Sequence, residues 1–374
     1  MAAIMQLPDI EHWRLGLEQP LLIGGPCGVE SPTQINAIAK ALAGSGVGML
    51  RGGIWKPRTR PGSFQGIGSE ALTWLKDAGV SVGLPVMVEV ASPFHVGEAL
   101  TAGIDVLWIG ARTTVSPFLV QEICEALRGV DIPVMVKNPI HPDLELWIGA
   151  LERLDQTGIH RLAAIHRGFH TYEKSSYRNA PLWSLPLELK RRIPTLPILN
   201  DPSHICGDRA LIAGVAQTAI DLGFNGLMVE VHPDPANALS DPEQQLTPDG
   251  FRTLMAGLVF RKPTTDDAVV RHVLDDLRKR IDRIDDELLH LLAVRMQAVR
   301  EIGEYKREHN MTIFQLERWN EILRTRPAIG AGLDLNKQFI VRLMELIHED
   351  SIHQQSQILY RQPTSDGKDA APTS

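Results

Sequence analysis

The chain has 374 residues, 44% of them hydrophobic and 22% charged, a composition typical of globular proteins with room for one large and one small domain. The formal net charge of -7 at pH 7 gives nucleic-acid binding no overall support, so any cationic site must be local. No uncharged apolar run approaches the roughly 20 residues of a membrane span and no signal segment opens the chain, so we expect a cytoplasmic protein without a membrane partner.

Short apolar runs rich in β-forming residues alternate with helical stretches from residue 20 to about residue 260. Strands are predicted over residues 21–24, 48–54, 86–90, 106–110, 134–137, 161–166, 198–200 and 226–231. Helices fit between them, for example over residues 33–43, 93–102, 116–127, 207–222 and 248–259. Eight such units match the size and repeat of a closed (β/α)8 TIM barrel. A doubly wound open sheet is the alternative, because periodicity alone does not show closure.

The second strand runs into the segment RGGIWKPRT, residues 51–59, which places three cations within eight residues. Arginine and lysine side chains suit carboxylate and phosphate oxygens. The segment therefore predicts a site for a phosphorylated, anionic small molecule. A solvated basic loop is the alternative interpretation of this segment taken alone.

Charged or metal-ligating side chains follow nearly every predicted strand. In a (β/α)8 barrel the catalytic groups lie at the carboxyl ends of the strands. In chain order these residues are Cys27, Arg51 with Lys56 and Arg58, Glu89, Arg112, Lys137, His166 with Arg167, His204, and Glu230 with His232. One such residue has little meaning, because strand ends face water, but the whole set predicts an active site.

Four of these ends suggest a metal site. Cys27, His204 and Glu230 belong to the first, seventh and eighth strands, which adjoin only if the sheet closes, and Asp241 lies on the following loop. A thiolate, an imidazole and two carboxylates suit a divalent ion such as Mn²⁺, Fe²⁺, Co²⁺ or Zn²⁺. Cys27 taken alone is more often a buried structural thiol than a ligand, and His232 is an alternative to His204 as the ligand.

The motifs GGPCGVE, RGGIWKPRT, GART, VKNP, HRG, DPSH and MVEVHPDP follow one another over about residues 20–260. In this order they resemble 3-deoxy-D-arabino-heptulosonate 7-phosphate (DAHP) synthase, the first enzyme of the shikimate pathway, and in particular its short-barrel type I beta subgroup. Sister enzymes that make 3-deoxy-octulosonate 8-phosphate or sialic acid share the barrel but lack the Lys-Pro-Arg-Thr arrangement. The resemblance implies condensation of phosphoenolpyruvate with erythrose 4-phosphate.

The resemblance also implies roles for the cations in binding phosphoenolpyruvate. Arg51 and Lys137 would lie near its carboxylate, and Lys56, Arg112 and Arg167 near its phosphate.

The second substrate and the chemistry involve further residues. Arg58 and Thr59 would hold the phosphate of erythrose 4-phosphate, and the metal would act as a Lewis acid on its aldehyde oxygen. Glu89 and Lys56 are the candidates for handling protons and the incoming water. An aldolase that forms a Schiff base through Lys56 or Lys137 is the alternative.

After residue 260 the pattern changes from mixed to purely helical. We predict a barrel domain over residues 1–262, a linker over 263–270, a helical domain over 271–360 and a disordered tail over 361–374. Helices are expected over about residues 268–309, 316–325 and 334–360. The first is too long for a small domain unless something packs along it, so a partner helix from a second subunit is predicted.

Cations on the first long helix fall on two faces. Arg295 and Lys306 are eleven residues apart and differ by only about 20° around the helix, whereas Arg278 points about 100° away from Arg295. Arg278 is therefore predicted to serve another cavity than the first two. Ser351 and Gln355 lie one helical turn apart and are able to face a common pocket.

This segment, from LRKRIDRIDDELL to EDSIHQQ, resembles the all-helical chorismate mutases over about residues 270–358. The resemblance implies an intertwined homodimer in which Arg278 comes from the partner chain. The pocket residues carried over by position are Arg295, Lys306, Arg318, Ser351 and Gln355. The rearrangement of chorismate to prephenate needs cations that hold a dicarboxylate and donors to the ether oxygen, a role that fits Lys306 and Gln355.

Two positions depart from the family pattern. Many members carry an acidic residue directly after the arginine at 318 and another three residues before it, where this chain has Trp319 and Gln315. A module that only senses chorismate or prephenate is therefore the alternative to a working mutase. Fusion of the two activities also predicts feedback inhibition of the barrel by prephenate.

Overall fold

The computed structural model describes residues 5–56, 62–172, 175–261 and 264–360. It divides into two compact units, Met1–Pro263 and Thr264–Ser374. Among the described residues, no helix combines the length and the apolar content needed to cross a lipid bilayer. The predicted tail over residues 361–374 lies outside the described residues.

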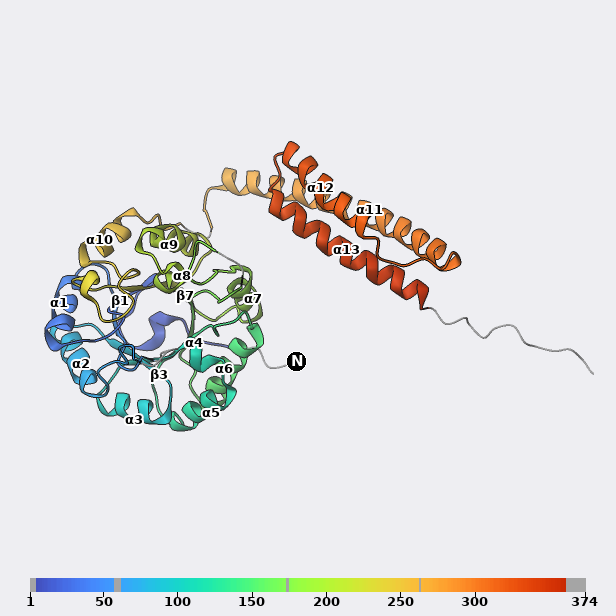
Figure 1. Ribbon diagram of the computed structural model, residues 1–374. Helices are drawn as coiled ribbons and strands as arrows, with labels where there is room; N and C mark the ends of the chain where they lie inside the picture. The colour runs from blue at the N-terminus through green and yellow to red at the C-terminus, as the bar shows by residue number, and fades with distance from the viewer. Residues whose placement is uncertain (1–4, 57–61, 173–174, 262–263, 361–374) are drawn as a thin grey trace, which may run out of the picture. The chain divides into compact units, whose positions relative to one another are not determined.

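The first unit is a closed barrel of eight parallel strands in chain order, so the open-sheet alternative is wrong (Figure 1). The strands are β1 (Leu21–Gly25), β2 (Met49–Gly52), β3 (Val86–Val90), β4 (Val106–Ile109), β5 (Val134–Lys137), β6 (Leu162–His166), β7 (Ile198–Asn200) and β8 (Gly226–Glu230). Closure is made by β1 and β8, which pair with Gly25 level with Glu230. This register brings together the side chains that follow the first and the last strands.

Helices surround the barrel and carry the chain from each strand to the next (Figure 1). They are α1 (Pro32–Leu42), α2 (Glu70–Val82), α3 (Pro93–Thr101), α4 (Ala111–Thr114), α5 (Pro117–Ala126), α6 (Leu144–Thr157), α7 (Ser184–Arg192), α8 (Pro202–Cys206), α9 (Ile212–Asp221) and α10 (Pro248–Gly257). Four of them, α1, α3, α5 and α10, begin with a serine or threonine cap followed by proline. The cap hydroxyl accepts a free backbone N–H and proline needs none, which fixes the helix start.

The barrel has an apolar core inside the strands and another between the strands and the helices. A short 3-10 helix, η1 (Ile10–Trp13), packs Ile10 and Trp13 against the inner core together with Met49, Met135 and Met228. Because all eight strands are parallel, the polar residues that follow them gather at one end of the barrel, the carboxyl end.

The second unit consists of three helices, α11 (Ala268–Glu308), α12 (Leu316–Gly332) and α13 (Lys337–Leu359). Helix α12 runs seven residues beyond its predicted end at residue 325 and contains Pro327, which is buried there. Helix α11 begins at Ala268, as predicted, and so includes the last residues of the stretch predicted as a linker. The Asp267 side chain accepts from the backbone N–H of Val269 and Val270. A proline within a helix and a cap within a polar stretch both resemble loop signals in the sequence.

Candidate functional sites

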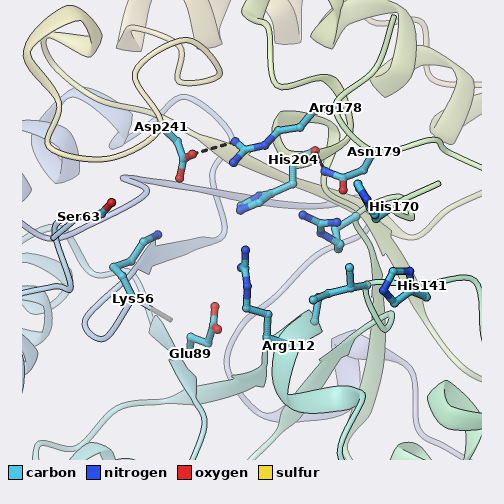
Figure 2. Close-up of a pocket in the computed structure, with 13 residues that line it drawn as sticks. Lys56, Ser63, Glu89, Arg112, His141, His170, Arg178, Asn179, His204 and Asp241 are labelled. Atoms are coloured by element: carbon cyan, nitrogen blue, oxygen red, sulfur yellow. Dashed lines mark hydrogen bonds and ion pairs between the residues drawn. The ribbon is translucent and has the colours of Figure 1, made fainter. Parts of the chain in front are cut away.

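A cavity of about 760 Å³ lies at the carboxyl ends of the barrel strands. Figure 2 shows side chains from separate loops pointing into it. Six of the residues predicted from the sequence line it, namely Lys56, Glu89, Arg112, Arg167, His204 and Asp241, and they are joined by Ser63, His141, His170, Arg178 and Asn179. Arg58 and Thr59 lie outside the described residues, so their expected role stays a prediction.

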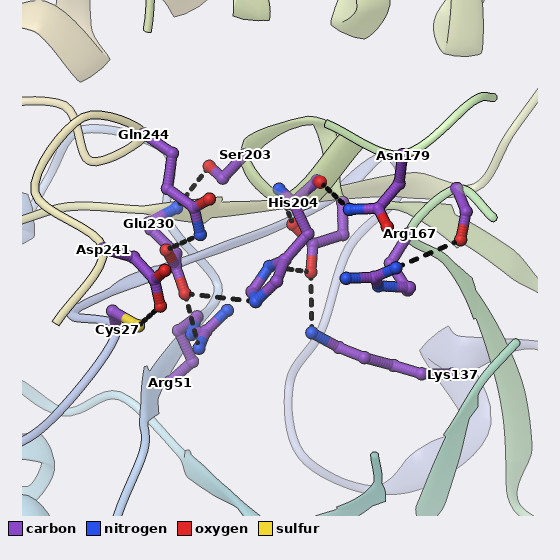
Figure 3. A network of polar contacts seen from close by, with 12 residues as sticks. Cys27, Arg51, Lys137, Arg167, Asn179, Ser203, His204, Glu230, Asp241 and Gln244 are labelled. Atoms are coloured by element: carbon purple, nitrogen blue, oxygen red, sulfur yellow. Dashed lines mark hydrogen bonds and ion pairs between the residues drawn. The ribbon is translucent and has the colours of Figure 1, made fainter. Parts of the chain in front are cut away.

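Buried ion pairs adjoin this cavity. Arg51 on β2 contacts Glu230 on β8 at 3.1 Å, and Lys137 on β5 contacts Asp201 at 2.7 Å (Figure 3). The Trp108 ring lies 5.2 Å from the Arg51 guanidinium and 5.7 Å from the Lys137 ammonium. Charges buried this deeply persist only when each has a partner, so the paired carboxylates keep both cations in place.

The Glu89 carboxylate is fixed at the edge of the cavity. Its Oε2 accepts a hydrogen bond of 3.0 Å from Nε1 of Trp108, the residue level with it on β4. A Cβ atom at Gly110 would lie 2.1 Å from Oε1 of Glu89, so glycine is required there to leave room for the carboxylate. The indole of Trp108 on β4 and the space left at Gly110, directly after β4, together set the position of Glu89.

The four predicted metal ligands meet as two pairs. The Cys27 thiol donates to Oδ2 of Asp241 at 3.2 Å, and Nε2 of His204 lies 3.7 Å from Oε1 of Glu230 (Figure 3). Across the described ranges, no group of three or more His, Cys, Asp or Glu side chains is drawn together as a metal cluster. His232 instead contacts Glu30 at 3.4 Å, so it is not paired with this set.

The protonation of His204 suits a bound cation, whereas that of Cys27 would have to change. Burial and the nearby Glu230 carboxylate raise the pKa of Cys27 to about 12, so at neutral pH it is a thiol whose proton a metal ion must displace. Burial lowers the pKa of His204, which keeps its imidazole neutral. Its Nδ1 lies 2.8 Å from Asp201, which leaves the Nε2 lone pair facing Glu230. A lone pair opposite a buried carboxylate oxygen is an arrangement that a cation between them would stabilise, so the donor set fits a metal.

Three supporting residues were not predicted from the sequence. Asp201 bridges Lys137 and His204, Arg178 binds Asp241 at 2.8 Å, and Gln244 donates to Glu230 at 2.7 Å. Asp201 belongs to the DPSH motif and follows a strand, so its position carried a signal. Arg178 and Gln244 lie on long loops, where no periodicity indicates which way a side chain points.

The helical unit brings together part of its predicted set. The Arg295 guanidinium on α11 donates to the Ser351 hydroxyl on α13 at 2.8 Å. The Lys306 ammonium donates to the Ile313 carbonyl at 2.5 Å, and Gln355 is buried beside Gly303, one helical turn from Lys306. These cations and polar groups therefore face the side on which α11 and α13 meet.

The two remaining arginines are exposed. Arg318 pairs with Glu321 at 2.5 Å and Arg278 pairs with Asp275 at 3.2 Å, each on its own helix. Arg278 precedes Arg295 by seventeen residues, which is about 25 Å along a helix. It does not join the other predicted residues of this set within one chain.

A closed barrel that gathers cations beside buried carboxylates, joined to an all-helical unit with a second set of cations, defines a two-domain enzyme for anionic small molecules. The sequence pattern of the DAHP synthetase I family matches residues 8–259, and that of the type II chorismate mutases matches residues 277–356. The chain belongs to the DAHP synthetase I family and carries a chorismate mutase domain after its barrel. Both resemblances seen in the sequence are thus confirmed.

Individual relatives agree with this assignment. The chain is 32% identical over 247 residues to phospho-2-dehydro-3-deoxyheptonate aldolase of Thermotoga maritima, a match that covers 66% of this chain and 71% of that protein. A 2-dehydro-3-deoxyphosphooctonate aldolase of Xylella fastidiosa is 29% identical over 251 residues, with 61% and 86% covered. Within the family, the chain is therefore similar both to a heptulosonate enzyme and, less strongly, to an octulosonate enzyme.

Two solved structures from Thermotoga maritima are similar to the barrel. The DAHP synthase has a TM-score of 0.57 at 33% identity and covers 63% of this chain and 67% of its own. A truncated form of 3-deoxy-D-arabino-heptulosonate 7-phosphate synthase has a TM-score of 0.58 at 29% identity, with 68% and 91% covered. The chain is accordingly a bifunctional enzyme, a DAHP synthase in its barrel and a chorismate mutase in its helices.

Proposed function

We propose that the barrel condenses phosphoenolpyruvate with erythrose 4-phosphate in a reaction that depends on a divalent metal ion. The proposal rests on two contacts beside a cavity lined by cations: Cys27 contacts Asp241, and His204 lies opposite Glu230. These four residues would hold the ion. When bound, it supplies a Lewis acid for the aldehyde oxygen of erythrose 4-phosphate. Mn²⁺ is the first ion to test, and Fe²⁺, Co²⁺ and Zn²⁺ suit the same donors.

Metal removal tests this proposal directly. After dialysis against EDTA, condensation by the full-length protein should be lost and should return when Mn²⁺ is added. Chorismate mutase turnover, which needs no metal, is the internal control. Full condensation activity in a preparation verified as metal-free contradicts the proposal.

The cations in and beside the cavity are proposed to bind phosphoenolpyruvate. Arg51 and Lys137, both buried and paired, are proposed to face its carboxylate. Lys56, Arg112 and Arg167 line the cavity and are proposed to bind its phosphate. Burial lowers the pKa of Arg167 to about 10, which still leaves a full positive charge at neutral pH.

The chemical steps use groups at the edge of the cavity. Carbon 3 of phosphoenolpyruvate attacks the aldehyde carbon, water adds at carbon 2, and phosphate leaves from the resulting tetrahedral intermediate. Glu89, fixed by Trp108, is proposed to handle the proton of the incoming water, with Lys56 as the second candidate. Arg58 and Thr59 are proposed to hold the phosphate of erythrose 4-phosphate.

A Schiff-base aldolase is less well supported by the geometry. Lys137 contacts Asp201 at 2.7 Å, and Lys56 donates to the sulfur of Cys27 at 2.8 Å. Both ammonium groups are engaged with acceptors, whereas a Schiff base begins with a free neutral amine. We expect borohydride to trap no lysine in the presence of substrates.

We propose that the mutase site is completed by two chains. Arg295, Lys306, Arg318, Ser351 and Gln355 would come from one chain and Arg278 from the second. The support is the long apolar surface of α11, on which Leu277, Ile281, Ile284, Leu288 and Leu291 are each at least half exposed in the single chain. Such a surface in water favours a partner helix, and a homodimer supplies it. We also propose a cytoplasmic location, because phosphoenolpyruvate and erythrose 4-phosphate are charged and do not cross a membrane unaided.

Prephenate is proposed to restrain the barrel when bound by the helical unit. The proposal rests on the fusion of an early and a later activity in one chain. Prephenate should lower the condensation rate of the full-length protein, and barrel ligands should alter prephenate affinity reciprocally. Condensation rates that do not respond to prephenate would end this idea.

A further inference from the structure

Two aromatic rings stack in the helical unit where the sequence departs from the mutase pattern. The indole of Trp319 on α12 and the imidazole of His348 on α13 lie 4.1 Å apart with 9° between their planes. Phe314, just before α12, contacts the same imidazole with centroids 6.0 Å apart. Stacking on one face and a tilted contact restrict how the His348 ring turns.

One nitrogen of the His348 ring is buried without a hydrogen-bond partner among the described residues. Within the described part of the chain, its Nε2 is shielded from solvent and has no hydrogen-bond partner. The same is true of Oε1 of Gln355. Buried polar atoms are nearly always satisfied, so two unsatisfied ones on one helix point to a ligand that supplies their partners.

The two atoms belong to one face of α13. Gln355 follows His348 by seven residues, which returns to within about 20° around a helix. Ser351 lies between them and accepts from Arg295 at 2.8 Å. Burial, and then the charges of Arg295 and Lys306, lower the pKa of His348, so the imidazole is neutral at pH 7. The cations of α11 therefore face the same space as His348 and Gln355.

The chemistry of chorismate assigns a task to each group. The substrate carries two carboxylates, an ether oxygen and one ring hydroxyl. Arginine and lysine suit the carboxylates, but neither accepts a hydrogen bond. A neutral imidazole both donates and accepts, which matches a hydroxyl. Gln315 and Trp319 stand where many mutases carry carboxylates. The Trp319 indole has no acceptor and Gln315 is exposed at the start of α12, so we look for the acceptor on another residue.

We propose that His348 binds the ring hydroxyl of chorismate through Nε2, and that Trp319 is the positioning residue that orients its ring. The inference rests on the proposed mutase site and adds to it the residue that discriminates substrates with the hydroxyl from those without it. Trp319 thus occupies the sequence position of a carboxylate but does not bind the hydroxyl. In this proposal His348 on α13 binds it instead.

A comparison of two substrates tests the inference. The full-length protein and its His348→Phe and His348→Gln variants are assayed with chorismate and with the analogue that lacks the ring hydroxyl. Phenylalanine keeps the stack but removes the nitrogen, so kcat/KM for chorismate should fall about tenfold. For the analogue it should stay within about twofold of wild type, and His348→Gln should recover part of the chorismate rate. An equal loss on both substrates, or no loss on either, overturns the inference.

Other readouts keep the test decisive. Condensation by the barrel and the size of the dimer report whether each variant folds. If His348→Phe does not fold, the wild-type protein decides the matter: it should prefer chorismate over the analogue by about tenfold, and equal rates overturn the inference. Absence of wild-type turnover with either substrate would instead contradict the proposed mutase site.

Discussion

The barrel and the helical unit build their sites in opposite ways. In the barrel, Arg51, Lys137 and Glu230 are at most 3% exposed, and each charge has its partner within the same chain. In the helical unit, Leu291 is 69% exposed and Arg278 meets no other residue of its predicted set. A barrel closes on itself, so one chain suffices to arrange the site. The three helices leave much of their apolar surface exposed in the single chain, so we propose that their site is completed by assembly.

Loss of a metal ligand should give the largest effect and should affect only the barrel. Cys27→Ala removes a donor of the proposed ion, and a Lewis acid supplies several kcal/mol, so condensation should fall by about 1000-fold. Steady-state assays of both activities, with Mn²⁺ binding followed by calorimetry, provide the measurement. Cys124→Ala is the matched control, because Cys124 is also buried but lies on α5.

Two results would break the contrast between the units. Mutase turnover that falls together with condensation in Cys27→Ala would mean that the two sites are not independent. Condensation and Mn²⁺ affinity that stay at wild-type values would remove Cys27 from the metal site.

Complementation between inactive chains tests whether the mutase site is shared. Arg278→Ala and Arg295→Ala should each abolish most turnover alone. If each site takes Arg278 from the second chain, a mixed dimer contains one intact site and one doubly altered site. Equal coexpression should then restore about a quarter of wild-type mutase activity, because half of the dimers are mixed and one of the two sites in each mixed dimer is intact. Mixtures as inactive as the single variants would place both arginines in one chain.

The contrast between the units also appears in what the sequence made predictable. All eight strands were predicted to within two residues at each end, because each is a short apolar run between turn signals. Helix α12 was predicted too short, because Pro327 is a breaker in the sequence, yet its ring is buried in the packed helix. The local signal was overridden by tertiary packing.

The site residues also differ in how well the sequence predicted them. Residues at strand ends, such as Lys137 and Glu230, were predictable because the barrel fixes where every strand ends. Arg178 came from a loop, and the unsatisfied nitrogen of His348 depends on a stack between two helices. Contacts of that kind follow from tertiary structure and leave no periodic signal in the sequence.

Neutralising the Glu89 carboxylate should affect only the chemical step in the barrel. Glu89→Gln keeps the shape and the acceptor for Trp108 but removes the base, so kcat for condensation should fall about 100-fold. Mn²⁺ affinity and mutase turnover should be unchanged, which separates proton handling from metal binding. Glu98→Gln on the outer helix α3 is the control. A kcat within about threefold of wild type rules out Glu89 as the base.

The smallest effect concerns stability in acid and should be confined to the barrel. His166 is fully buried, its Nε2 donates to the Pro181 carbonyl at 2.6 Å, and burial lowers its pKa from 6.5 to about 3. Below pH 6.5 the unfolded chain therefore takes up a proton that the folded barrel does not. Stability should fall by about 2.3 kcal/mol between pH 6.5 and pH 4.5 from this group alone.

Denaturant unfolding of the barrel at several pH values measures this loss, and His166→Gln isolates it. The variant should be less stable at pH 7 but should lose about 2.3 kcal/mol less than wild type between pH 6.5 and pH 4.5. His160→Gln, whose side chain is 63% exposed in wild type, should behave as wild type does. Parallel curves for wild type and His166→Gln would mean that the ring is protonated within the folded barrel. The unfolding of the helical unit should not respond to either substitution, because the barrel buries this group by itself.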